Sequence, residues 1–203
     1  MIEARSLDQA ARAFRDELSA LLGSTITHSH VRSVLPRGGK VAMISISEGN
    51  IPGAPLKARK LGERVVLGLG QHLTSDVTKS GAHILRTVKY RYLLSLEGEA
   101  DAIVRWDYDR ERPESDEAHC RHHLQGTPDI VVNGRHLPLE DFHLPTGYVP
   151  IEEVIRFCVV DLGVKPLRSD WDDVLETSYR RFRTNLRCPR YADCEQVAEY
   201  REV

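Results

Sequence analysis

The sequence lacks the short motifs that identify common enzyme classes. It contains no P-loop, no GxSxG elbow, no HExxH pair and no CxxC pair, so no nucleotide-binding loop, serine-hydrolase centre or zinc-protease centre is indicated. Of the four cysteines, Cys188 and Cys194 flank Pro189 at a spacing that fits no closed four-ligand site, and Cys120 and Cys158 fall in unrelated segments. The spacing argues against a structural zinc finger.

Long apolar runs and a strong net charge are also absent. Runs such as 158–162, interrupted by Asp161, fall far short of the roughly 20 residues that a membrane-spanning helix requires. The first ten residues have no apolar signal segment, so we expect a cytoplasmic protein without a membrane partner. A formal charge of -2 argues against general coating of nucleic acid but leaves room for a local basic patch.

Three segments have helical periodicity. Ser6 and Gln9 form a capping box before an apolar stripe that ends at Gly23, which predicts a helix over about 7–22. Pro150 and two glutamates open a second predicted helix, over about 150–162 and ending at Gly163. A third begins at Ser169, with acids first and arginines last, as the helix dipole favours.

The residues between these helices alternate or are β-branched, as in strands. The pattern predicts hairpins over 25–35 with 40–47, over 85–95 with 102–109, and over 130–132 with 135–137, the last with an Asn-Gly turn. It also predicts a short strand over 64–69 and a strand that carries His122 and Leu124. The segment 48–60, with two prolines and two glycines, is expected to be a loop.

These patterns together predict one α+β domain over 1–203, an antiparallel sheet with an N-terminal helix and two C-terminal helices. The expected parts are the helix within 1–24, the sheet region over 25–149, the helical pair over 150–187 and a tail over 188–203. At 203 residues the chain can bury a core without disulfide or metal staples.

The most suggestive cluster for chemistry holds His119, His122 and His123. Imidazoles titrate near neutral pH and bind transition metals, and in a strand Arg121 and His123 would share one face while Cys120 and His122 would share the other. An arginine beside a proton-transfer group suits phosphodiester cleavage. Tyr90 and Tyr92, on one face of an earlier strand, could supply a phenol or a base-stacking surface.

Metal binding is a second interpretation. His28 and His30 would share one face of a strand, as the first two ligands of many metal sites do, and a third ligand could come from His119, His122 or His143. Asp107 and Asp109 could instead hold a divalent ion with a phosphate. No cofactor is expected, with a divalent metal kept as the alternative.

The C-terminal basic segment is a candidate nucleic-acid interface. Its arginines alternate with aromatic residues and could lie along RNA or an acidic partner; they are Arg180, Arg181, Arg183, Arg187 and Arg190. A solvated helix end that complements the helix dipole explains the same charges.

The order of three motifs over about residues 25–126 resembles the TumE-type toxin family of prokaryotic toxin–antitoxin modules. The motifs are Tyr90-Arg91-Tyr92, then Arg105-Trp106-Asp107-Tyr108, then the segment 119–123. The histidine order differs from that family, since the lone histidine comes first and Gln125 stands where a later histidine is expected. The two C-terminal helices look longer than such small toxins need, which suggests dimerisation or partner binding.

Two hypotheses follow. The first is a toxin-like or antiphage-defence protein that cleaves RNA, with His122 or His123 as general acid/base and with Arg121 and Arg105 stabilising the phosphorane charge. The second is a non-catalytic subunit whose arginines and sheet edge bind RNA or a protein such as a cognate antitoxin. The first requires Arg105, Arg121 and a cluster histidine to share one surface.

Overall fold

The computed structural model describes residues 4–111, 121–126, 129–132, 135–138 and 144–186. The helices in these ranges are α1 (Leu7–Thr25), α2 (Ile151–Val160) and α3 (Trp171–Leu186). The strands are β1 (His30–Val34), β2 (Ala42–Glu48), β3 (Ile51–Pro52), β4 (Ala54–Ala58), β5 (Glu63–Val77), β6 (His83–Leu96), β7 (Ala102–Asp109), β8 (His122–Gly126), β9 (Asp129–Val132), β10 (Arg135–Pro138) and β11 (Leu144–Pro145). No helix in these ranges is long and apolar enough to span a membrane.

Nine of the described strands form one sheet. Seven lie in the order β1-β2-β5-β6-β7-β8-β11, while β3 pairs with β2 and β4 pairs with β5. Every pairing between named strands is antiparallel, and β9 and β10 form a separate hairpin. The predicted α+β fold, with an antiparallel sheet, an N-terminal helix and two C-terminal helices, is confirmed.

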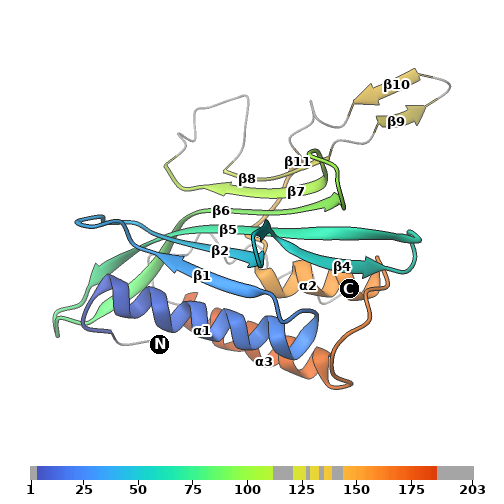
Figure 1. Cartoon of the computed structure of the whole chain (residues 1–203). Coiled ribbons are helices and arrows are strands. Elements are labelled where there is room, and N and C mark those ends of the chain that lie inside the picture. The colour runs from blue at the N-terminus through green and yellow to red at the C-terminus, as the bar shows by residue number, and fades with distance from the viewer. Residues whose placement is uncertain (1–3, 112–120, 127–128, 133–134, 139–143, 187–203) are drawn as a thin grey trace.

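All three helices lie on one side of the sheet (Figure 1). The core fills the space between them and the sheet, because alternate strand residues point to this side. Trp106 of β7, for example, meets Phe157 of α2 edge to face, with ring centroids 5.6 Å apart. The core residues include Leu18 and Leu22 of α1, Val154, Ile155 and Cys158 of α2, Leu175 of α3, and Leu67, Leu69, Tyr92 and Leu94 of the sheet. The opposite side of the sheet, which these helices do not cover, is called the helix-free face below.

Two expected element boundaries were wrong at the start of the chain. Gly23 does not end α1, which runs on to Thr25, where the Thr25 hydroxyl donates to the carbonyl of Leu21 at 2.8 Å. That side-chain bond ties Thr25 back onto the preceding helical turn. The following strand therefore begins at His30, five residues later than its β-branched composition suggested.

The expected loop over 48–60 was also wrong, since it holds β3 and β4. Gly53 separates the two strands with a φ of 92°, a conformation that glycine adopts without strain. In β4, Ala54, Leu56 and Ala58 are buried against β5. Prolines are tolerated in an edge strand, which is why their presence misled the prediction.

The long β5–β6 hairpin is the largest departure from the predicted lengths. The expected strand over 64–69 extends to Val77, and it is paired with β6 from Val65 to Val77 with a register shift after His72. Its second half is polar, so apolar alternation alone could not reveal it. The strand extends because β6 supplies partners for its backbone groups.

Candidate functional site

The sheet register separates the predicted catalytic residues into two groups on opposite faces. Tyr90 pairs across β7 with Tyr108, which pairs with His122, whereas the next row runs from Arg91 through Asp107 to His123. Residues directly opposite in antiparallel strands share a face and neighbouring rows alternate. His122 therefore lies on the helix-covered face and His123 on the helix-free face.

Tyr90 and Tyr92 are core residues, with exposed fractions of 1% and 0%. The Tyr90 hydroxyl accepts a hydrogen bond from the backbone N–H of Val149 at 3.0 Å, and the Tyr92 hydroxyl bonds the side-chain amide of Gln71. Burial raises the pKa of Tyr92 well above its ordinary value. Neither phenol offers a stacking surface to RNA on the helix-free face, although their predicted catalytic role is untested.

The His122 ring stacks on Tyr108, with centroids 4.3 Å apart and planes 12° apart. Burial, with smaller contributions from Arg121 and His123, lowers the pKa of His122 to about 4. Its Nδ1 lies 3.5 Å from the Tyr90 hydroxyl. A mostly buried neutral imidazole in an aromatic group is well placed to pack against the core and poorly placed to reach a substrate on the other face.

On the helix-free face, the carboxylate of Asp107 gathers three basic side chains. Arg91 Nε donates to Oδ1 at 2.8 Å, Arg105 Nε lies 2.5 Å from Oδ2, and His123 Nε2 lies 3.8 Å from the same oxygen. These four residues are called the Asp107 cluster. Asp107 and His123 are 7% and 4% exposed, whereas the side chains of Arg91 and Arg105 are 52% and 32% exposed.

The next cross-strand row on the helix-free face also pairs a basic side chain with a carboxylate. Lys89 lies opposite Asp109, and its ammonium donates to that carboxylate at 2.8 Å. Arg105 also donates to the side chain of Gln125. Asp107 and Asp109 do share a face, as a shared metal ligand pair would, but each carboxylate contacts a basic side chain.

Arg121 lies directly before β8, and its carbonyl accepts from the N–H of Asp109 at 3.1 Å. This places its backbone beside the Lys89 row. His119, Cys120 and His143 lie outside the described residues. The structure thus brings Arg105 and His123 together but separates them from His122 and both tyrosines.

Sequence reasoning did not include Arg91 or Lys89 in the site. Strand alternation could have found them, because residues 89 and 91 must face away from Tyr90 and Tyr92. Their partners could not be read from the sequence, since the pairing of Arg91 with Asp107 depends on a register that shifts between Leu94 and Ser95.

Arg180 and Arg181, the two α3 arginines whose side chains the structure describes, form no common surface with the Asp107 cluster. Arg180 and Arg181 are exposed, and Arg180 donates to Glu176 one turn earlier at 3.0 Å. The side chain of Arg183 and the whole of Arg187 lie outside what the structure describes. Since α3 packs below the sheet (Figure 1), Arg180 and Arg181 belong to the helix-covered side.

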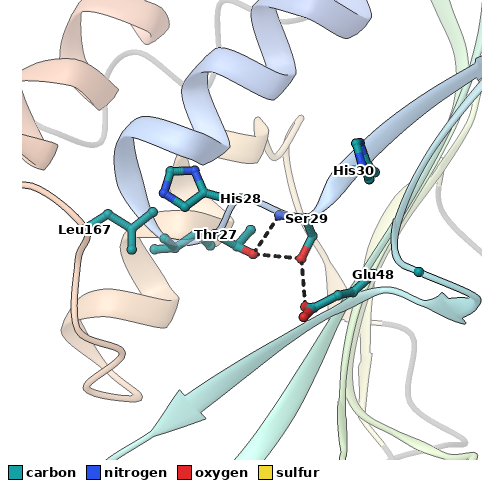
Figure 2. Close-up of a pocket in the computed structure, with 8 residues that line it drawn as sticks. Thr27, His28, Ser29, His30, Glu48 and Leu167 are labelled. Atoms are coloured by element: carbon teal, nitrogen blue, oxygen red, sulfur yellow. Dashed lines mark hydrogen bonds between the residues drawn. The ribbon is translucent and has the colours of Figure 1, made fainter.

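His28 and His30 do not act as one strand pair, because β1 begins only at His30. Both side chains are exposed and line a pocket together with Glu48, and Figure 2 shows the two rings apart from each other. Within the described part of the chain, no group of three histidine, cysteine or acidic side chains could hold a metal ion.

Comparisons with family models, with curated proteins and with solved structures find no match to this chain. The resemblance to the TumE-type toxins therefore stays a prediction from three short motifs.

Proposed function

We propose that the protein binds RNA through the helix-free face of β6, β7 and β8, with Arg91 and Arg105 as its principal phosphate contacts. The observation that carries this proposal is the Asp107 cluster, in which one buried carboxylate pairs with two partly exposed arginines on the helix-free face. An arginine held in place loses less side-chain entropy when it binds a phosphate.

Arg91 is the better placed of the two arginines. Its Nε is bonded to Asp107, which leaves both terminal nitrogens without an ion pair or hydrogen bond among the described residues. Those nitrogens form the planar fork that binds phosphate oxygens in pairs. With its side chain 52% exposed, Arg91 can meet a phosphodiester without leaving Asp107.

The local charge balance supports an anionic ligand. Lys89, Arg91 and Arg105 outnumber Asp107 and Asp109 among the paired charges of this surface, although the whole chain carries a formal charge of -2. The tyrosines and the tryptophan of β6 and β7 lie on the other face or are buried. Binding is therefore expected to depend on phosphate contacts more than on base stacking, and so to fall with salt.

The test measures fluorescence anisotropy of a labelled 20-nucleotide single-stranded RNA with the wild type, Arg91→Gln and Arg168→Gln. Arg168 is the matched control, because it is 55% exposed and its Nε also donates to an aspartate, Asp170, at 2.8 Å. We expect Arg91→Gln to weaken binding about tenfold and to reduce the log–log salt slope by about 0.7, the value for one contact to a single strand. Arg168→Gln should change neither quantity.

Equal affinities of Arg91→Gln and the wild type would contradict the proposed surface. Equal binding of a DNA strand of the same length and base sequence would keep the phosphate contacts but remove the preference for RNA. Circular dichroism of each variant checks that the fold is retained.

A second candidate function, RNA cleavage, is favoured by one distance. His123 Nε2 lies 3.8 Å from the Asp107 carboxylate, on the same face as Arg105. The carboxylate can orient the imidazole for proton transfer, and the arginine can stabilise negative charge on a phosphate. The imidazole is 4% exposed, so cleavage needs a small rearrangement that lets a ribose hydroxyl reach it. This is the chemistry expected of a toxin that acts on RNA.

Cleavage of purified cellular RNA by the wild type, His123→Gln and His30→Gln, each with and without EDTA, tests this second function. The enzymatic proposal expects loss of cleavage in His123→Gln with RNA affinity retained, unchanged cleavage in the exposed-histidine control His30→Gln, and persistence in EDTA. Binding without cleavage by the wild type would instead support a non-catalytic RNA-interaction subunit. Growth arrest on expression, relieved by His123→Gln, is the corresponding expectation for a toxin.

A further inference from the structure

A polar pocket lies at the other edge of the sheet from the Asp107 cluster, where α1 ends and β1 begins (Figure 2). Its volume is about 360 Å³, within the range of small-molecule sites. One part of its wall is apolar, formed by Ile26 and Leu167, and the remainder is polar. The polar residues are Thr27, His28, Ser29, His30, Glu48 and Gly49.

The hydroxyl groups of Thr27 and Ser29 form a hydrogen-bonded series that ends at the carboxylate of Glu48 (Figure 2). Ser29 Oγ donates to Glu48 Oε2 at 3.2 Å, and Thr27 Oγ1 lies 2.8 Å from Ser29 Oγ. Because the single Ser29 proton is used on Glu48, the Thr27 hydroxyl must be the donor to Ser29. Thr27 and Ser29 are both buried, so they hold one oxygen of an exposed carboxylate in place.

The second oxygen of Glu48, Oε1, has no hydrogen bond to a described residue. The guanidinium of Arg32 in β1 donates to the carbonyl of Gly49, a pocket residue, at 3.1 Å. That bond uses one arginine nitrogen on a backbone group, and Glu48 itself lines the pocket. A carboxylate oxygen in this position favours a ligand that donates a charge-assisted hydrogen bond.

The end of α1 adds a second source of negative potential. Residues 26–28 follow directly from its last turn, which contains no basic side chain. The C-terminal end of a helix carries a partial negative charge that favours cations. Some end carbonyls have partners, since Leu22 O accepts from the N–H groups of Ile26 and Thr27, but those partners are neutral backbone groups.

We propose that this pocket binds a small primary amine, with the ammonium group on Glu48 and a short alkyl chain against Leu167. Leu167 is 45% exposed at the pocket wall, and Ile26 behind it is buried, so an alkyl chain of a few carbons gains contact area there. The site is independent of the RNA-binding proposal, because it shares no residue with the Asp107 cluster.

The test titrates the full chain with butylamine, butanol and butyrate, three probes of equal chain length that differ in charge, and follows amide shifts by ¹H–¹⁵N NMR at pH 7.5. Butylamine should shift the amides of 26–30, 48 and 49 in a saturable way, and butyrate should not. Glu48→Gln, an isosteric change at an exposed side chain, should weaken butylamine binding about tenfold, as expected for a lost bond to a charged group. The matched control Glu63→Gln, an exposed glutamate at the start of β5, should bind butylamine like the wild type.

A second variant tests the apolar wall. Leu167→Ala should reduce the preference for butylamine over ethylamine several-fold while leaving ethylamine affinity nearly unchanged. Equal shifts from butanol and butylamine, or unchanged butylamine affinity in Glu48→Gln with a native-like spectrum, would overturn the proposal.

Discussion

The imidazole of His122 is held among aromatic rings on the helix-covered face, against Tyr108 and within reach of Tyr90. Its lowered pKa of about 4, caused mainly by burial, means that the folded state prefers the neutral ring. In the unfolded chain the imidazole takes up a proton at ordinary histidine pH. The unfolded state therefore binds more protons between about pH 6.5 and pH 4, and the contribution of His122 to stability is lost as the pH falls through this window.

We expect His122→Phe to keep the ring stacking and to remove this pH dependence. The free energy of unfolding of the wild type should fall by about 1–2 kcal/mol more than that of the variant between pH 7 and pH 4, a figure reduced from the full shift because part of the ring is in water. Urea unfolding at a series of pH values measures the difference. Parallel pH profiles for the two proteins would contradict the assignment.

Glu152, at the start of α2, is another buried titratable group, with 6% of its surface exposed. Burial raises the pKa of this carboxyl group, while a hydrogen bond from Ser178 of α3, at 2.6 Å, acts in the opposite direction. A raised pKa means that the folded state favours the protonated acid, so stability is lost as the pH rises through the folded-state pKa.

Glu152→Gln should therefore stabilise the protein at neutral pH by about 1 kcal/mol, because an amide oxygen can still accept from Ser178 without a buried charge. The gain should fade as the pH falls and the wild-type acid becomes protonated. Thermal unfolding at pH 7.5 and pH 4 measures it, with Glu153→Gln, in the same helical turn, as control. A loss of stability at neutral pH would mean that the charge itself stabilises the start of α2.

At the scale of elements, Gly53 determines how β3 passes into β4. Its φ is 92°, and a Cβ built on it would lie 2.4 Å from Val66 Cγ1 and 3.0 Å from the Leu67 carbonyl. A side chain here meets both an unfavourable backbone conformation and the neighbouring strand β5. Gly98, in the β6–β7 turn, has a nearly identical φ of 91° with nothing within 4 Å of such a Cβ.

This pair of glycines separates backbone strain from steric overlap. Gly98→Ala should cost about 1 kcal/mol of unfolding free energy, from the positive φ alone, and Gly53→Ala should cost about 3 kcal/mol or more because β4 must also shift from β5. Chemical denaturation of both variants gives the comparison. Equal losses would show that β4 moves aside without cost.

The elements also show which features of the fold could be predicted from the sequence. The alternation of β6 and β7 and the Gly163 stop after α2, where φ is 70°, could be predicted because both are local. β4 and the second half of β5 could not, because Pro55 and the polar residues after Gly70 become strand only through their partners. Propensity describes a residue alone, whereas strand extension is a property of a pair.

The candidate site was predictable in part, for the same reason. Alternation placed Arg121 and His123 on one face of a strand and Cys120 and His122 on the other, and it placed Tyr90 and Tyr92 together on one face of an earlier strand. The choice of which histidine faces the helices, and the meeting of Arg91, Arg105 and His123 at Asp107, depend on the register of three strands. Register reflects turn geometry and packing that a single sequence does not display.

At the scale of the whole molecule, the helices cover one face of the sheet (Figure 1). The other face carries charged pairs such as Arg91 with Asp107 and Lys89 with Asp109. The two proposed sites lie toward opposite edges of this sheet, the Asp107 cluster on β6, β7 and β8 and the amine pocket beside β1. Ligand binding at the unaltered site can therefore serve as the folding control for a variant at the other site, since distant substitutions usually act additively.

The contact between α1 and α3 joins the first described helix to the last. The backbone N–H of Leu167, just before α3, also donates to the carbonyl of Thr25 at the end of α1. During synthesis on the ribosome, α1 emerges before any strand of the sheet, and its apolar stripe at Leu18, Leu21 and Leu22 has no complete cover until α3 follows. Strands β1, β2, β5 and β6 can cover part of α1 as they are made, but its native packing is complete only once α3 has also left the ribosome.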